Sequence, residues 1–136
     1  MNHWLVKSEP ETYGWQQFVA DKKTDWTGVR NYQARNFLRA MKTGDKVLYY
    51  HSGKEKAVVG TATVSRAAFP DPTAGPSDEN WSAVELRPAH PLPAPVPLAI
   101  IRADPKLSKM WLLTHSRLSV QPVTREEYAH IVQAGL

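Results

Sequence analysis

The 136-residue sequence contains no cysteine. This absence excludes a disulfide framework, a zinc site with cysteine ligands, an iron–sulfur cluster and a thiol nucleophile. No apolar run approaches the roughly 20 residues of a membrane-spanning helix, and residues 1–4 lack the basic and then apolar layout of a secretory signal. A hydrophobic content of 42% argues against a disordered tail. We therefore expect one compact domain over residues 1–136, located in the cytoplasm and without a membrane partner.

Motifs that identify large enzyme families are also missing. The sequence has no GxGxxG, GxxxxGK[ST], HExxH or GxSxG motif. Its five histidines are scattered without the spacing of metal ligands. We therefore expect no metal, no cofactor and no catalytic residue. His51 and Ser52 do not form a convincing base and nucleophile, because neighbouring residues of a strand point to opposite faces. Together with Tyr50, they are better placed to line the mouth of a pocket.

Positive charge is concentrated in the first half of the chain. Residues 1–66 carry 11 basic and 6 acidic side chains, whereas residues 67–136 carry 6 basic and 7 acidic ones. The excess is densest over residues 30–56, at Arg30, Arg35, Arg39, Lys42, Lys46, Lys54 and Lys56. Such an uneven distribution is typical of nucleic-acid binding proteins, although a solvated basic surface produces the same pattern.

Hydrophobic periodicity predicts a mixed α+β domain built around a sheet or a small barrel. Strands are expected near residues 3–7, 46–51, 57–64, 81–86 and 118–121, the last ending at Pro122. The proline-rich residues 88–97 predict an extended edge or a connector, because proline cannot donate a backbone hydrogen bond. Helices are expected where apolar residues recur at helical spacing, and these are Trp15, Phe18 and Val19; Ala34, Phe37, Leu38 and Met41; and Tyr128, Ile131 and Val132. Asn31 is a candidate N-cap for the second helix, and Thr124 with Glu127 fits a capping box for the third.

Trp26 differs from the other tryptophans. Trp4 and Trp15 fall at apolar positions of expected elements and are interpreted as core residues. Trp26 lies before Thr27 and Gly28, in a stretch without apolar periodicity. Its ring could stack on a planar ligand or pack into the core, and both interpretations stay open.

Four segments of the chain carry a recognisable pattern. They are KSEP at 7–10, WTGVRNYQARNFLR at 26–39, YHSG at 50–53 and SRLSVQP at 116–122. Together they resemble the EVE domain, a relative of the PUA, ASCH and YTH domains, from about residue 3 to the C-terminus. The resemblance is to free-standing bacterial members of that family.

The resemblance implies a PUA-like fold, in which a bent and mostly antiparallel sheet forms a pseudo-barrel with flanking helices. It also implies a non-enzymatic, monomeric binding module. YTH domains, which are similar, take a methylated base into an aromatic-lined pocket. The expected partner is accordingly DNA or RNA that carries a modified base, with modified cytosine as the leading candidate.

The same resemblance assigns roles to particular residues. Trp26 would stack on the base, Val29 and Leu118 would supply apolar walls, and Ser8, Asn31, Tyr50, His51 and Ser52 would offer polar groups to its edge. Flanking phosphates would be bound by Arg30, Arg35, Arg39, Lys54 and Arg117. Some of these residues have structural alternatives. Asn31 could act only as a helix cap, Lys54 could serve only to keep a hairpin soluble, and Arg117 could pair with Glu9.

Two functions of other classes remain as alternatives. Related ASCH-type domains include hydrolases, so the chain could act on a nucleoside-like or amide substrate with His51 as the general base. It could also be an adaptor that captures a protein partner through the proline-rich residues 88–97.

Overall fold

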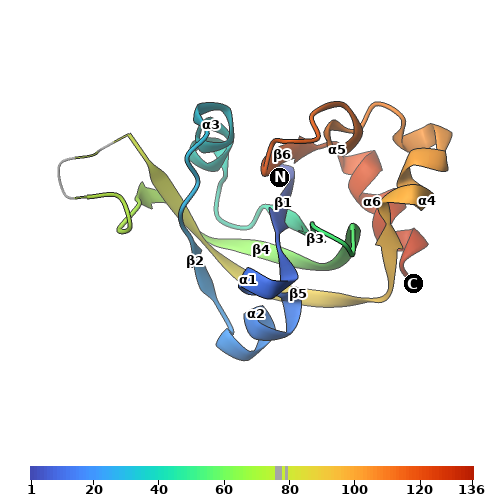
Figure 1. The fold of residues 1–136 in the computed structure, drawn as a ribbon, viewed down its shortest axis with the longest axis horizontal. Coiled ribbons are helices and arrows are strands. Elements are labelled where there is room, and N and C mark those ends of the chain that lie inside the picture. Colours follow the sequence, from blue (N-terminus) through green and yellow to red (C-terminus); the bar gives the residue numbers. More distant parts are fainter. Residues whose placement is uncertain (76–77, 79) are drawn as a thin grey trace.

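The computed structural model describes residues 1–75, 78 and 80–136. Within these residues six strands form one mixed sheet in the order β2-β5-β4-β3-β1-β6, with helices at its flanks (Figure 1). The strands are β1 (His3–Ser8), β2 (Thr24–Trp26), β3 (Lys46–His51), β4 (Ala57–Pro70), β5 (Ser82–Pro97) and β6 (Val120–Val123). The helices are α1 (Pro10–Tyr13), α2 (Trp15–Asp21), α3 (Tyr32–Ala40), α4 (Leu98–Ala103), the 3-10 turn η1 (Pro105–Leu107), α5 (Trp111–Thr114) and α6 (Arg125–Ala134).

The sheet is mostly antiparallel, and it is open. Strands β1 and β3 run parallel, and the other four neighbouring pairs are antiparallel. The long β4–β5 pair contains four register shifts, which bend and twist it. The predicted α+β, PUA-like architecture is confirmed. Among the described residues its sheet does not close, because β2 and β6 remain as its two edges.

The proline-rich residues 88–97 form the second half of β5. They pair with β4 on one side, as at Gly60–Pro91 and Thr61–His90, whereas the pairing of β2 with β5 ends at Leu86. The predicted extended edge is confirmed. An edge position suits this segment, because the missing proline N–H groups are not required on the open side.

Both faces of the sheet are buried. Along β3, Val47 and Tyr49 face one core cluster, and Leu48 and Tyr50 face the other. Residues of α2 and α3 pack in the first cluster, and residues of α4, α5 and α6 pack in the second. This two-sided burial explains why β3 is a continuous apolar run instead of an alternating one. Trp4, predicted in the core, is 5% exposed and belongs to the first cluster.

Local signals located α3 and α6 correctly. The Asn31 side chain accepts a hydrogen bond from the Ala34 amide at 2.9 Å, and Ala34 and Leu38 are buried. Thr124 and Glu127 form both hydrogen bonds of the predicted capping box.

Two local predictions were wrong. Val19 is 46% exposed, and Phe18 alone of the α2 residues is buried. The last strand does not end at Pro122 but continues to Val123. Proline is accepted inside β6, because β6 is an edge strand.

Gly60 in β4 gives the first testable prediction. A Cβ atom at this position would lie 2.5 Å from the indole of Trp15, whose ring is already packed against Phe18 and Tyr49. Overpacking of this kind costs about 1–3 kcal/mol, so we expect Gly60→Ala to lower the free energy of unfolding by that amount in urea titrations. Gly75→Ala is the control, because a Cβ there meets no atom within 4 Å. Equal stability of the two variants would contradict this account of Trp15 packing.

Candidate nucleic-acid interface

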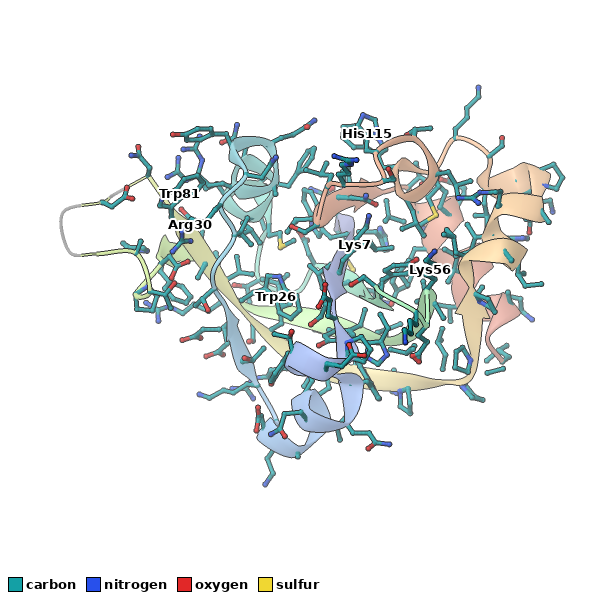
Figure 2. All side chains as sticks on the ribbon, viewed as in Figure 1. Lys7, Trp26, Arg30, Lys56, Trp81 and His115 are labelled. Atoms are coloured by element: carbon teal, nitrogen blue, oxygen red, sulfur yellow. The ribbon has the colours of Figure 1, made fainter. Side chains whose placement is uncertain are left out.

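A cavity of about 580 Å³ opens beside the end of β1, the loop to α1 and the segment from β2 to Arg30. Its lining residues are Lys7, Ser8, Glu9, Thr12, Tyr13, Thr24, Asp25, Trp26, Thr27, Gly28, Val29, Arg30 and Ser119. Three of these lining residues, Lys7, Trp26 and Arg30, are labelled in Figure 2. The structure therefore brings together three of the predicted base-pocket residues, Ser8, Trp26 and Val29, at one cavity.

Trp26 forms an aromatic wall of this cavity, which we call the Trp26 cavity. Short strand β2 holds it by pairing Trp26 with Val84 of β5. Its ring meets the ring of Tyr49 edge-on, with centroids 5.7 Å apart and an interplanar angle of 83°. Trp26 is only half-buried. The ring therefore packs in part on the core, as one interpretation of the sequence expected, and it also lines the cavity; stacking on a ligand stays a prediction.

The hydroxyl groups of Ser8 and Tyr49 meet at one backbone carbonyl. Each donates a 2.7 Å hydrogen bond to the carbonyl oxygen of Tyr13. Burial raises the pKa of Tyr49 to about 12, so this phenol remains a donor at neutral pH. With its proton committed to Tyr13, Ser8 can offer a ligand in the cavity only its acceptor lone pairs.

Lys7 is a cavity residue that the sequence interpretation missed. Its ammonium group donates to the Ser116 carbonyl at 2.7 Å, and burial lowers its pKa. An ammonium group has three donors, so this bond leaves two for a ligand. Lys7 and Glu9 belong to the KSEP segment, from which only Ser8 was assigned a role. Membership in this recognised segment could have identified Lys7 and Glu9 as cavity residues.

Arg30 is held by a buried carboxylate. Its guanidinium donates to Asp71 at 2.9 Å and to the Thr73 hydroxyl at 3.1 Å, and the Asp71 side chain is completely buried. The Gly28 amide donates to the same carboxylate at 2.8 Å, at a glycine with φ of +80°. Burial alone raises the pKa of Asp71. Hydrogen bonds from Thr73, Gly28 and Arg30 outweigh that effect and lower it to about 2.

This arrangement changes the interpretation of Arg30. Its guanidinium fixes the loop that lines the Trp26 cavity, and the phosphate contact expected of it stays a prediction. Asp71 is a second residue that the sequence did not reveal. It lies 41 positions from Arg30, in the loop after β4, and no local pattern marks it.

Asn31 and Leu118 lie at a second, smaller hollow. This hollow of about 280 Å³ is also lined by Gln33, His115, Ser116 and Arg117. The hollow is next to the Trp26 cavity in sequence. Arg30 of the cavity directly precedes Asn31 of the hollow, and Ser119 of the cavity directly follows Leu118 of the hollow. The predicted capping role of Asn31 is observed, so its Oδ1 atom is already occupied by the Ala34 amide.

The structure places Tyr50 and His51 away from the Trp26 cavity. Strand alternation turns Tyr50 into the second core cluster, where it is 4% exposed. His51 instead lines a separate cavity of about 540 Å³, together with Trp15 and Glu55. Ser52 does not line the Trp26 cavity, but its backbone amide donates a 3.0 Å hydrogen bond to the carbonyl of Ser8, which does.

Both ring nitrogens of His51 have partners. Nε2 accepts the Trp15 backbone N–H at 3.0 Å, and Nδ1 lies 2.8 Å from a Glu55 carboxylate oxygen. The Trp15 bond requires an unprotonated Nε2, so the ring proton is on Nδ1, where it is donated to Glu55. A general base needs a free acceptor nitrogen. His51 does not offer one in this arrangement.

The remaining predicted phosphate ligands lie in different surroundings. Arg35 donates to the Asn80 carbonyl at 3.1 Å, and Arg39 donates to the same carbonyl at 3.2 Å and to the Ser82 hydroxyl at 2.9 Å. These bonds tie α3 to the start of β5. Lys54 is exposed in the β3–β4 turn, and Arg117 is exposed at the rim of the smaller hollow. Within the described ranges no ion pair joins Arg117 to Glu9.

No group of three or more histidine, aspartate or glutamate side chains in the described part of the chain could hold a metal ion. No helix there is both long and apolar enough to cross a membrane.

Comparison with known proteins decides the family. The sequence profile of the EVE domain matches residues 2–134. The chain belongs to the EVE domain family. An EVE relative, human thymocyte nuclear protein 1, is 34% identical, and the alignment covers 96% of this chain and 72% of that protein.

Solved EVE structures share the fold over nearly the whole chain. Protein Atu2648 from Agrobacterium tumefaciens superposes with a TM-score of 0.96 at 48% identity, covering 99% of this chain and 93% of that one. Human THYN1 protein, crystallised in complex with DNA containing 5-methylcytosine, superposes with a TM-score of 0.90 at 34% identity, covering 99% and 98%. An ASCH protein from Zymomonas mobilis, at 12% identity and a TM-score of 0.61, shares the fold alone.

Proposed function

We propose that this EVE protein is a non-enzymatic module that binds a modified base, with 5-methylcytosine in DNA as the leading candidate, in the Trp26 cavity. The observation that carries the proposal is one cavity of about 580 Å³ whose lining residues include the half-buried Trp26, the apolar Val29 and the charged residues Lys7 and Glu9. The structural likeness to human THYN1, which was crystallised with DNA containing 5-methylcytosine, supports the choice of ligand.

The chemistry of the cavity complements a cytosine. A base reaches such a site only after leaving its stack, at a cost of a few kcal/mol. Stacking on the indole of Trp26 offsets this cost, since base–aromatic stacking contributes about 1–3 kcal/mol. Among the lining residues, an ammonium group such as that of Lys7 can donate to the O2 or N3 acceptors of cytosine, and a carboxylate such as that of Glu9 can accept from its amino group. Val29 provides apolar surface for a methyl group.

The enzyme and adaptor alternatives have less support. His51 lies at another cavity with both ring nitrogens occupied. Residues 88–97 are part of β5 and pair with β4, so they are not a free ligand for a protein partner. Turnover of nucleosides or modified nucleotides by the purified protein would restore the enzyme hypothesis.

Fluorescence anisotropy tests the proposed function directly. The protein is titrated at fixed moderate salt into single- and double-stranded oligonucleotides that differ only in cytosine, 5-methylcytosine, 5-hydroxymethylcytosine, adenine or N6-methyladenine. We expect a preference above tenfold, or about 1.4 kcal/mol, for 5-methylcytosine. Uniform weak binding that disappears with added salt would contradict the proposal.

Arg117 provides a test of the phosphate contacts. We expect Arg117→Ala to weaken every oligonucleotide to a similar degree and to reduce the slope of log affinity against log salt by about one. The matched control is Arg102→Ala, because Arg102 is also exposed but lies on α4, whose side chains pack in the second core cluster. A loss confined to methylated oligonucleotides would contradict a phosphate role for Arg117.

A further inference from the structure

Two aromatic rings lie stacked on the surface next to the Trp26 cavity. Tyr32 is the first residue of α3, and Trp81 precedes β5. Their ring centroids are 5.0 Å apart, with an interplanar angle of 22°. The Tyr32 residue is 59% exposed, and Trp81 is half-buried. We call this pair the Tyr32–Trp81 stack.

Packing in the hydrophobic core does not explain the position of the exposed Tyr32 ring. Neither Tyr32 nor Trp81 belongs to the two core clusters or to the hydrophobic residues packed against them. The N-terminus of α3 is capped by Asn31, so Tyr32 is not required there as a cap. More than half of the Tyr32 surface stays in water although Trp81 and the Arg35 guanidinium both lie against its ring, and exposed aromatic surface of this kind can stack on another planar group.

Positive charge flanks the stack on both rings. The Arg35 guanidinium lies 4.8 Å from the centroid of Tyr32, and that of Arg30 lies 5.4 Å from the Trp81 ring. Arg30 is neutralised by Asp71, whereas no salt bridge among the described residues includes Arg35. An exposed aromatic ring beside a guanidinium complements a nucleobase with its phosphate.

Arg30 connects the stack to the cavity, because it lines the Trp26 cavity and contacts Trp81. Figure 2 shows Arg30 and Trp81 side by side at the end of the sheet nearest α3. When one base leaves its strand for the cavity, an adjacent base loses a stacking neighbour. We propose that the Tyr32 ring stacks on a base adjacent to the one bound in the Trp26 cavity. This inference rests on the proposed function.

An abasic-site cycle tests the inference. Two oligonucleotides with 5-methylcytosine carry an abasic sugar on its 5′ or on its 3′ side, and a third carries all its bases. We expect Tyr32→Ala to weaken binding of the intact oligonucleotide about tenfold, within the range for one stacked base. One of the two abasic oligonucleotides lacks the base that would stack on Tyr32. Tyr32→Ala should not weaken the binding of that oligonucleotide any further. Tyr32→Phe should restore the wild-type pattern.

The controls separate this inference from the proposed function. Ile100→Ala removes an equally exposed apolar side chain, 56% exposed on α4, and should leave every affinity unchanged. Tyr32→Ala should keep the preference for 5-methylcytosine over cytosine, because the cavity is intact. In one outcome the preference for 5-methylcytosine is present, but Tyr32→Ala weakens binding of the intact and both abasic oligonucleotides equally. This result would contradict stacking by Tyr32 and leave base binding in the Trp26 cavity supported. If the wild type shows no modified-base preference, the proposed function fails. The same titrations are then made with unmodified oligonucleotides. If these do not bind, or if the effect of Tyr32→Ala does not depend on the position of the abasic site, the proposed stacking by Tyr32 is contradicted as well.

Discussion

Replacing Trp26 with alanine should remove the preference for 5-methylcytosine over cytosine. The variant loses a stacking surface worth about 1–3 kcal/mol, which corresponds to roughly 5–150-fold in affinity. The phosphate contact proposed for Arg117 lies outside the Trp26 cavity, so weak, salt-sensitive binding of all oligonucleotides should persist. Anisotropy titrations of methylated and unmethylated oligonucleotides, run in parallel at one salt concentration, measure both quantities.

Two further variants make the Trp26 result interpretable. Trp26 also packs edge-on against Tyr49, so the unfolding free energy of Trp26→Ala must be measured alongside its binding. Trp111→Ala is the matched control, because Trp111 is also half-buried but packs against Phe37 and His115. Trp26→Phe keeps an aromatic face and should retain part of the preference. A Trp26→Ala protein that folds and still discriminates the methyl group would place the base elsewhere.

Replacing Asp71 with asparagine should give the largest loss of stability. The substitution keeps the shape of the side chain but removes the charge that binds Arg30 and accepts from the Gly28 amide. Lowering of the pKa from 3.8 to about 2 corresponds to roughly 2.5 kcal/mol of stabilisation at neutral pH. We therefore expect Asp71→Asn to lower the unfolding free energy by about that amount at pH 7, measured in urea. Because Gly28 and Arg30 line the Trp26 cavity, affinity for the methylated oligonucleotide should fall as well.

The pH dependence gives this prediction a second readout. The carboxyl group of Asp71 has a depressed pKa in the folded state, so its contribution is complete above the unfolded value near 4. The contribution is lost as the pH falls from about 4 toward 2. The stability difference between wild type and Asp71→Asn should therefore shrink toward zero over this interval. Asp78→Asn, at an exposed position, is the control and should leave the unfolding free energy at pH 7 nearly unchanged. A difference that stays constant with pH would contradict the charge-based explanation.

The parts of the fold that the sequence revealed depend on local signals. The α3 helix was located by Asn31 and an apolar stripe, and α6 by its capping box, because these interactions span only three or four residues. The error at Pro122 arose because a proline is excluded from central strands only, and strand order is not a local property.

The candidate site was only partly predictable for the same reason. Trp26, Val29 and Ser8 were identified through recognised segments and lie at one cavity. Tyr50 and His51 came from an equally recognisable segment, but they face the second core cluster and a different cavity. Which segments share a cavity depends on the pairing of β1, β3 and β5 with strands distant in sequence. Local sequence patterns do not reveal these pairings between distant strands.

The proline-rich half of β5 also affects contacts between copies of this protein. An open sheet edge normally presents a row of N–H and C=O groups on which another strand can pair, leading to aggregation. Five of the ten residues 88–97 are prolines, so half of this segment has no N–H group to offer to a strand on either side. The amide of Ala94, which lies between two of them, already donates to the Gly135 carbonyl at the end of α6. A neighbouring copy therefore finds few free donors there, and the edge is protected against sheet extension and fibre growth.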